Sequence, residues 1–239
     1  MQFYRDFPPP KALTFDLDDT LYDNRPVIRR AEQAMYDWLA SCHPQSKMIG
    51  RDRWQALKMA LAAADPMLRH DVTQWRFELI KIGLMQLGYP LAKAELAAED
   101  GLARVLVVRN QVDVPDETHR VLSLLSQKLP LVAITNGNVD ADKIGLAGYF
   151  ESVLMAGRDG LSKPEPDLFI KASVQLGLAP DEILHVGDHL VTDVGGAKLN
   201  GFRACWFNDQ QRMLSQEPKV RGLPDMEINQ LSQLLLLIP

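Results

Sequence analysis

Residues Leu13 to Leu21, which read Leu-Thr-Phe-Asp-Leu-Asp-Asp-Thr-Leu, join a short apolar run to a dense group of carboxylates. The apolar run, Ala12 to Phe15, is too short for a helix and lacks a 3.6-residue period, so it is typical of a buried strand. Asp16, Asp18 and Asp19 follow it at once. Carboxylates gathered at the end of a buried strand repel one another unless a cation neutralises them. This strand end can therefore seat a nucleophile beside a hard metal such as Mg²⁺, whose ligands are oxygens.

The first two of these carboxylates can divide the chemistry of phosphoryl transfer between them. Asp16 is the candidate nucleophile, because a carboxylate that attacks a phosphoryl group forms an acyl phosphate and splits one hard hydrolysis into two easier steps. Asp18 lies two residues further on, so in extended geometry its side chain points to the same side. It can then protonate the leaving oxygen and later accept a proton from the attacking water. Asp19 falls between the motif positions and is given no catalytic role; it is expected to anchor a turn.

Two later segments supply groups that bind phosphate. Thr135, Asn136 and Gly137 follow the strand-like run Leu131 to Ile134. A hydroxyl and backbone N–H groups at a strand end can hold phosphate oxygens, and a glycine lets the backbone approach closely. Lys163 lies in a predicted loop, where its ammonium group could neutralise the nucleophile and the phosphoryl oxygens. A turn-forming Thr135 and a solvated Lys163 are the plain alternatives.

A third segment ends the apolar run Glu182 to Val186 with an acidic residue, Asp188. Asp188 is a candidate metal ligand. Asp193 is a second acidic support, which can bind a metal directly or through water because Mg²⁺ keeps several of its waters. Thr192 and Asp193 could equally open a predicted helix, Val194 to Asn200.

In this order the four segments resemble the haloacid dehalogenase superfamily of aspartyl-phosphate hydrolases, and the resemblance spans Asp16 to Asp193. Each motif alone is weak because short acidic motifs occur by chance, whereas four of them in the right order are specific. The resemblance implies a Mg²⁺ cofactor. It also implies catalytic roles for Asp16, Asp18 and Lys163, substrate-binding roles for Thr135, Asn136 and Gly137, and metal-binding roles for Asp16, Asp18, Asp188 and Asp193.

The remaining sequence divides into a helical part and an alternating part. From Pro26 to Asn110 the apolar residues recur only at helical spacing. Beyond this segment, strand and helix patterns alternate, which favours a parallel sheet with helices on both faces. The expected elements are helix Asp116 to Gln127, strand Leu131 to Thr135, strand Ser152 to Met155, helix Asp167 to Leu176, strand Glu182 to Val186, helix Val194 to Asn200 and strand Arg203 to Trp206.

We therefore expect an α/β fold with a Rossmann-like parallel sheet. Residues 1–24 and 112–239 would form this core, and residues 25–111 would form an inserted helical cap. In open α/β sheets a ligand lies beyond the carboxyl ends of the strands, which is where all four motifs fall. The strand pattern and the motifs are separate observations, and both place the site at the same edge of the sheet.

In the family, a helical insert at this position is the first-type cap. Its physical use would be to close over the site, exclude water and contact the non-phosphate part of the substrate. His70, Asp71, Thr73 and Arg76 form one polar cluster near Trp75. Arg76 could reach a polar group of the substrate, although a solvated helix face is the commoner meaning of such residues.

Composition and charge narrow the possible partners. Charged residues make up 24% of the chain, and its net charge is −5, so the broad basic face that nucleic-acid binding needs is not expected. Cys42 and Cys205 form no metal-ligand pattern and are expected to be reduced thiols. The segment Met1 to Lys11 lacks the apolar core of a signal peptide, and Leu234 to Ile238 is too short to span a bilayer. We expect a cytoplasmic monomer or weak homodimer with no membrane partner.

These observations predict a magnesium-dependent hydrolase of small phosphorylated metabolites that works through an aspartyl-phosphate intermediate. The sequence is similar to enteric-bacterial phosphatases of the flavin pathway over Asp16 to Pro26, His70 to Thr73 and Ile183 to Asp188. Those enzymes dephosphorylate amino(phosphoribitylamino)uracil and also hydrolyse flavin mononucleotide. The resemblance therefore implies a phosphatase of riboflavin biosynthesis, and the identity of the substrate rests on resemblance alone.

Three alternatives stay open. A haloacid dehalogenase would share the aspartate nucleophile but needs no acid for a halide leaving group, so the presence of Asp18 argues against it. A phosphomutase would need the cap to hold a bisphosphorylated intermediate, which the sequence does not exclude. A non-enzymatic binding protein with this fold would be expected to lack Asp16 or Asp18, and both are present.

Overall fold

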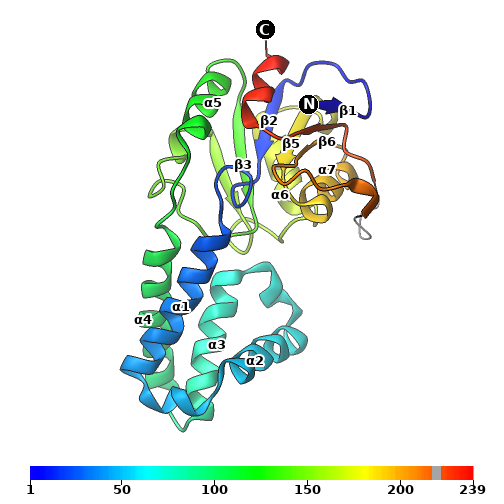
Figure 1. Cartoon of the computed structure of the whole chain (residues 1–239). Coiled ribbons are helices and arrows are strands. Elements are labelled where there is room, and N and C mark those ends of the chain that lie inside the picture. Colours follow the sequence, from blue (N-terminus) through cyan, green and yellow to red (C-terminus); the bar gives the residue numbers. More distant parts are fainter. Residues whose placement is uncertain (217–221, 239) are drawn as a thin grey trace. The chain divides into compact units, whose positions relative to one another are not determined.

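The structure, a computed structural model, describes residues 1–216 and 222–238 (Figure 1). The chain forms two compact units. One unit contains Met1–Asp23 and Asp113–Pro239, and the other contains Asn24–Val112. The insert predicted from the sequence, residues 25–111, differs from the second unit by one residue at each end. No helix within the described ranges is long and apolar enough to cross a membrane.

The first unit is built on a seven-stranded sheet with the strand order β1-β7-β6-β5-β2-β3-β4. Its strands are β1 (Gln2–Phe3), β2 (Ala12–Phe15), β3 (Leu131–Thr135), β4 (Ser152–Met155), β5 (Ile183–Gly187), β6 (Arg203–Phe207) and β7 (Met226–Ile228). Neighbouring strands are parallel except β1 and β7, which run antiparallel. The predicted α/β fold with a Rossmann-like, mainly parallel sheet is confirmed, and the antiparallel edge pair is an addition to it.

The helices of this unit are α5 (Asp116–Ser126), α6 (Asp167–Leu176) and α7 (Gly196–Leu199), with short turns η3 (Ala147–Tyr149), η4 (Pro180–Glu182), η6 (Leu214–Gln216) and η7 (Leu231–Leu237). The start of the predicted helix Val194 to Asn200 is wrong, because α7 begins at Gly196. Leu190–Gly195 forms a π-helical turn, η5, that leads into α7. His189 caps this turn, because its Nδ1 accepts a hydrogen bond from the Thr192 N–H at 3.1 Å. Asp193 therefore lies inside a helical turn and does not open one.

The central strand, β2, sets the position of everything at the carboxyl edge of the sheet. It pairs with β3 on one side and β5 on the other, and all of its residues are buried. Its last residue, Phe15, lies opposite Ala133 of β3 and Val186 of β5. Because the three parallel strands end close to the same level, the segments that follow them meet at one edge.

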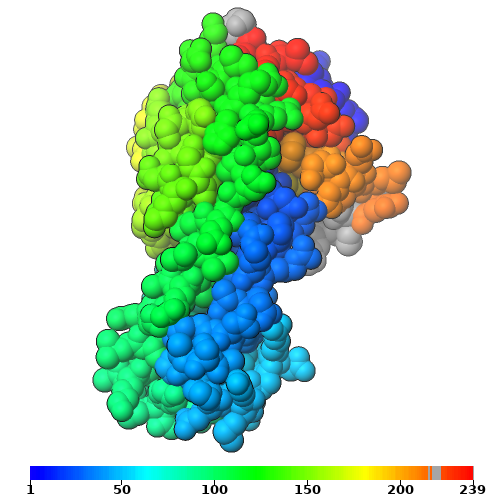
Figure 2. Space-filling model, turned by 60° about the vertical axis from the view of Figure 1, so that its left-hand side comes forward, coloured from blue at the N-terminus to red at the C-terminus, as the bar shows by residue number. Residues whose placement is uncertain are grey.

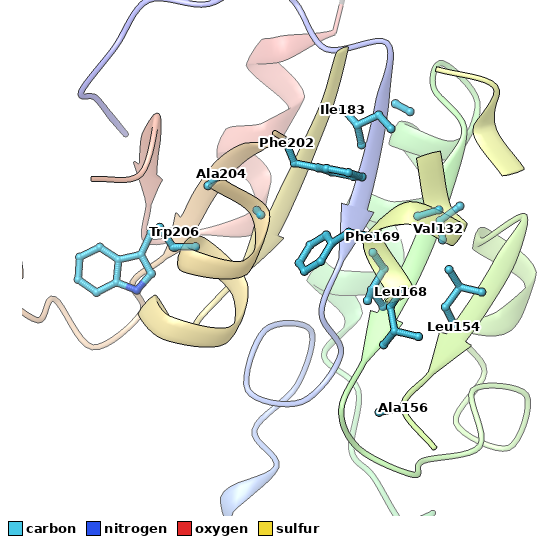
Figure 3. Packing of buried hydrophobic residues seen from close by; sticks show 14 of the residues in the cluster. Val132, Leu154, Ala156, Leu168, Phe169, Ile183, Phe202, Ala204 and Trp206 are labelled. Carbon is cyan, nitrogen blue, oxygen red and sulfur yellow. The ribbon is translucent and has the colours of Figure 1, made fainter. Parts of the chain in front are cut away.

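Apolar packing fixes α6 against the sheet. Phe169 of α6 and Phe202 make a T-shaped contact with their ring centroids 5.3 Å apart. Val132, Ile183 and Ala204 from three different strands belong to the same buried cluster (Figure 3). Burying a side chain of this size contributes roughly 1.5–3 kcal/mol. These contacts hold the loop before α6, which carries Lys163, close to the ends of β2 and β5.

The second unit contains α1 (Arg25–Cys42), α2 (Arg51–Ala64), α3 (Val72–Gln86) and α4 (Leu91–Arg109), with the turns η1 (Pro44–Met48) and η2 (Pro66–His70). Helix α4 packs along α1 and α3, and the side-by-side course of α1 and α4 is visible in Figures 1 and 2. A Cβ atom added to Gly83 would lie 2.0 Å from the Trp54 ring, and one added to Gly101 would lie 2.5 Å from the Trp38 ring. The two glycines therefore make room for two buried indoles.

Candidate active site

Acidic side chains from two neighbouring strand ends meet at the carboxyl edge of the sheet. Asp16 follows β2 directly, Asp188 follows β5, and Asp193 lies in η5. One carboxylate oxygen from each residue lies within 4.8 Å of the other two. The structure thus brings together three of the four residues predicted as metal ligands. Asp18 is outside this group of three.

Lys163 lies between two of these carboxylates. Its Nζ is 2.6 Å from Asp16 Oδ1 and 2.7 Å from Asp193 Oδ1, and it donates to the backbone oxygen of Ile134 at 2.6 Å. The Lys163 side chain is 1% exposed. A buried ammonium group needs strong partners, because its desolvation costs several kcal/mol. Here two carboxylates and one carbonyl accept its three protons. The alternative of a solvated Lys163 is wrong.

The segment after β3 holds Lys163 in place. Asn136 Nδ2 donates to the Lys163 backbone oxygen at 2.9 Å, and the Lys163 N–H donates to Asn136 Oδ1 at 2.7 Å. The Asn136 amide is therefore engaged with the Lys163 loop. Thr135 is fully buried, and its Oγ1 accepts a hydrogen bond from the Gly137 N–H at 3.0 Å. Because this oxygen acts as an acceptor, the Thr135 hydroxyl can still donate its own hydrogen to a phosphate oxygen.

Thr20 ties the nucleophile candidate to Asp188, a role that the sequence analysis missed. Its hydroxyl donates to Asp16 Oδ2 at 3.3 Å and accepts from the Asp188 N–H at 3.1 Å. Thr20 is 2% exposed, so water cannot readily replace either bond. The available signal was a hydroxyl residue four positions after Asp16, within the same acidic motif.

Asp18 lies in a tight turn just beyond β2. Tyr22 Oη donates to Asp18 Oδ1 at 2.6 Å. Asp19, between them, has a φ of +59°, in the left-handed region that aspartate tolerates in turns. Asp18 is half-buried whereas Asp16 is buried, so its carboxylate is held near the strand end without being sealed off from water.

Asp193 has protein donors on both carboxylate oxygens. Oδ1 pairs with Lys163 and lies 3.4 Å from His185 Nε2, and Oδ2 accepts from the His189 N–H at 2.9 Å. A Cβ atom on Gly187 would lie 2.4 Å from the Asp193 Cγ. The strand must therefore end in glycine for Asp193 to pack against it.

Two side chains hold the backbone of Asp188. Trp206 Nε1 and Arg212 Nη2 donate to its carbonyl oxygen at 2.9 and 2.8 Å. Burial, followed by the charges of Asp193 and Asp19, raises the pKa of Asp188 to about 7. At neutral pH this carboxyl group is close to half protonated in the absence of a cation.

The acidic cluster carries more negative charge than Lys163 neutralises. Burial raises the pKa of Asp16 well above its ordinary range, although the charge of Lys163 acts in the opposite direction. Burial also acts to raise the pKa of Asp193, but Lys163 and His185 outweigh it and lower the pKa of that group. Burial acts to lower the pKa of Lys163, and the two carboxylates outweigh this effect and raise it. Ionising Asp16 and Asp188 together is therefore unfavourable without a further positive charge. A divalent cation with oxygen ligands, such as Mg²⁺, fits this donor set.

The polar cluster of the helical unit contains a capping group, Asp71, and a cation, Arg76, and a second cation, Lys58, lies against the neighbouring Trp75 ring. Asp71 caps α3, because its Oδ1 accepts from the Thr73 N–H at 3.0 Å. Arg76 is half-buried and makes no hydrogen bond or ion pair with another residue in the part of the chain that the structure describes. Lys58 Nζ lies 4.9 Å from the centroid of the Trp75 ring. Burial, followed by the charge of Arg76, lowers the pKa of Lys58.

Comparison with known proteins gives matches over nearly the whole chain. The 5-amino-6-(5-phospho-D-ribitylamino)uracil phosphatase of Escherichia coli is 44% identical over 238 residues, which cover 100% of both chains. A phosphoserine phosphatase of Thermus thermophilus is 30% identical and covers 95% of this chain and 98% of its own. The crystal structure of a 2-haloacid dehalogenase from Pseudomonas syringae superposes with a TM-score of 0.89 at 35% identity, covering 95% of this chain and 97% of that one.

A family model agrees with these pairwise matches. The model of haloacid dehalogenase-like hydrolases matches residues 10–201. This range includes the acidic cluster, Lys163 and the segment after β3. The chain therefore belongs to the haloacid dehalogenase-like hydrolase family.

Proposed function

We propose that this protein is a magnesium-dependent phosphatase that releases phosphate from 5-amino-6-(5-phospho-D-ribitylamino)uracil and also from flavin mononucleotide. The full-length similarity to the Escherichia coli phosphatase supports the first substrate. The observation that carries the reaction class is the buried ammonium group of Lys163, 2.6 Å from Asp16. It neutralises a carboxylate that would otherwise repel a phosphate anion.

In this proposal Asp16 and Asp18 act in turn. An oxygen of Asp16 attacks phosphorus, and the bond to the leaving oxygen breaks as Asp18 gives that oxygen a proton. Asp18 then removes a proton from a water molecule, which attacks the phosphorus of the aspartyl phosphate and releases Asp16 and inorganic phosphate. Proton transfer of this kind usually contributes about 10²–10⁴-fold in rate. The Thr135 hydroxyl would donate to a phosphoryl oxygen, and Lys163 would supply positive charge beside the phosphoryl group.

Asp16 and Asp188 would hold the metal ion. When bound, Mg²⁺ would supply positive charge beside the transferring phosphoryl group. We assign Asp193 a supporting part, because Lys163, His185 and the His189 N–H already occupy its carboxylate oxygens. It would orient Lys163 and reach the metal at most through water.

A dehalogenase is the second candidate, because the Pseudomonas syringae structure with that title is 35% identical to this chain. Halide is a weak base and leaves without a proton. Asp18 would then have no leaving group to protonate in the first step, although a 2.6 Å hydrogen bond from Tyr22 Oη holds its carboxylate in place. We therefore favour an oxygen leaving group. A phosphomutase would use the same first step and differ in keeping the phosphoryl group on the product.

We further propose that the helical unit is the cap domain that selects the substrate. Two half-buried cations of this unit, Lys58 and Arg76, support this role. A guanidinium group presents a planar fork of donors that suits carbonyl oxygens and other flat acceptors. The uracil ring of the proposed substrate offers such oxygens.

The substrate assignment can be tested by phosphate release in Mg²⁺ with purified substrates. Amino(phosphoribitylamino)uracil should give a higher kcat/KM than phosphoserine or acetyl phosphate, and 2-chloropropionate should release no chloride. Arg76→Gln should lower kcat/KM for the uracil substrate at least about tenfold more than for acetyl phosphate, since a hydrogen bond to a charged group contributes about 1.5–3 kcal/mol. Arg69→Gln, at an exposed position, is the matched control. Equal losses on both substrates would contradict the selecting role of Arg76.

The metal assignment predicts a pH-dependent effect of Mg²⁺ on thermal stability. The pKa of Asp188 is raised to about 7, so its proton must leave before the metal binds. Apparent Mg²⁺ affinity should therefore be about tenfold weaker at pH 6 than at pH 8. Thermal unfolding with increasing Mg²⁺ measures this, because binding raises the melting temperature. Asp188→Asn should abolish the shift and the exposed control Asp181→Asn should keep it. A shift that is equal at both pH values would contradict the assignment.

The two catalytic aspartates should respond differently to removal of their charge. Asp18→Asn keeps the nucleophile, so p-nitrophenyl phosphate should give one burst of nitrophenolate and then stall, because nitrophenolate leaves without a proton. An alkyl phosphate should be slow from the start, by about 10²–10⁴-fold. Asp16→Asn should give no burst with either substrate. Asp19→Asn, in which asparagine also tolerates a positive φ, should keep full turnover. A burst from Asp16→Asn would refute covalent catalysis at this residue.

A further inference from the structure

One buried titratable group at the site has no part in the mechanism above. His185 lies on β5 and is 1% exposed. Its Nδ1 is 2.9 Å from the hydroxyl of Thr14, which lies directly opposite on β2. Its Nε2 is 3.4 Å from Asp193 Oδ1. A continuous line of polar contacts therefore runs from Thr14 through His185 and Asp193 to Lys163 and the nucleophile Asp16.

The direction of these hydrogen bonds follows from the charges. Asp193 is ionised beside Lys163 and can only accept, so His185 Nε2 must carry a hydrogen and donate. Burial lowers the pKa of His185 below its ordinary value, although the hydrogen bond to Asp193 acts in the opposite direction, so the ring is neutral. In a neutral ring Nδ1 is then an acceptor, and the Thr14 hydroxyl donates to it. The Asp193 carboxylate thus selects the tautomer with its hydrogen on Nε2, and the Thr14 hydroxyl holds the opposite nitrogen of the ring.

The surroundings keep the imidazole ring in this orientation. Phe169 packs against it edge-on, with the two ring centroids 5.2 Å apart. Thr14, His185, Asp193 and Lys163 are all 2% exposed or less. Water therefore cannot readily replace a lost donor at this site. If the Asp193 carboxylate loses a hydrogen bond here, the buried acceptor is left unsatisfied, which favours a change in its position.

We propose that His185 is a positioning residue for catalysis, held by Thr14, which fixes the Asp193 carboxylate so that Asp193 in turn holds Lys163 against Asp16. This inference rests on the proposed function, since it assigns His185 to the attack of Asp16 on phosphorus. Without the His185 donor, Asp193 keeps only its bonds to Lys163 and to the His189 N–H, so the position of its Oδ1 beside Lys163 is less tightly fixed. A shift of Asp193 would in turn change how the ammonium group is placed beside Asp16, which lies 2.6 Å away.

The burst of the Asp18→Asn enzyme separates this role from a purely structural one. With p-nitrophenyl phosphate, the amplitude of the burst counts the competent molecules, and its first-order rate constant reports the attack by Asp16. A loss of folding alone lowers the amplitude and leaves the rate constant unchanged. A misplaced Lys163 lowers the rate constant of the molecules that remain competent. The two readings come from a single stopped-flow trace.

We expect His185→Leu in the Asp18→Asn background to lower the burst rate constant on the order of tenfold, as loss of a supporting hydrogen bond to a site ligand typically does. His185→Gln should recover part of the loss, because its amide can donate toward Asp193. Thr14→Val should give a smaller loss than His185→Leu, since it removes one hydrogen bond to the ring and keeps the ring itself. Ser173→Ala is the matched control, because Ser173 donates to the Leu178 backbone oxygen elsewhere in the same unit. It should keep the parent rate constant.

An unchanged rate constant in both His185→Leu and Thr14→Val would overturn the inference, whatever the amplitudes. Should His185→Leu fail to fold, His185→Gln and Thr14→Val decide: a reduced rate constant in Thr14→Val supports the inference, and parent rates in both overturn it. Failure of the proposed function looks different. In that case the Asp18→Asn parent itself gives no burst, before any change at His185 or Thr14.

Discussion

The arrangement at the carboxyl edge of the sheet depends on one buried ammonium group, Lys163, placed between Asp16 and Asp193. Lys163 and Asp16 are 147 residues apart in the chain, so the contact exists only because the sheet and α6 are correctly formed. Breaking a buried ion pair by removing one partner typically costs about 3–5 kcal/mol, because a charge is then left without compensation. Much of the surrounding structure, including the amide of Asn136 and the bare backbone of Gly187, serves to keep this geometry.

The same cluster shows how stability and reactivity are balanced. Lys163 keeps Asp193 ionised, whereas burial raises the pKa of Asp16 and of Asp188, so both of these groups resist ionisation. A fold selected for stability alone would have fewer carboxylates here. A divalent cation bound by these carboxylates would favour their ionised forms and so keep the nucleophile unprotonated. Thr20 joins the two segments that carry Asp16 and Asp188.

The sequence predicted those features that local signals decide. The bounds of α6, Asp167–Leu176, agree with the prediction because Pro166 precedes the helix and Gly177 ends it with a φ of +63°. The strands β2, β3 and β4 are equally well marked by short apolar runs. The links made by Thr20 and His185 were missed because each joins segments about 170 residues apart, which no local pattern records. The start of η5 was missed because a π-helical turn capped by a histidine has no recognised sequence signal, and the two-residue strand β1 is too short to carry one.

In the proposed reaction Asp16 becomes covalently phosphorylated, and Lys163 neutralises its carboxylate before the attack. The most direct measurement is to quench the stalled Asp18→Asn enzyme in acid after one turnover of p-nitrophenyl phosphate and to locate the phosphoryl group by peptide mass spectrometry. We expect one phosphoryl group per enzyme molecule, on Asp16. We expect no labelled peptide when hydroxylamine cleaves the acyl phosphate before digestion. A phosphoryl group on another residue, or free phosphate released in the burst with no labelled peptide, would contradict the proposed reaction.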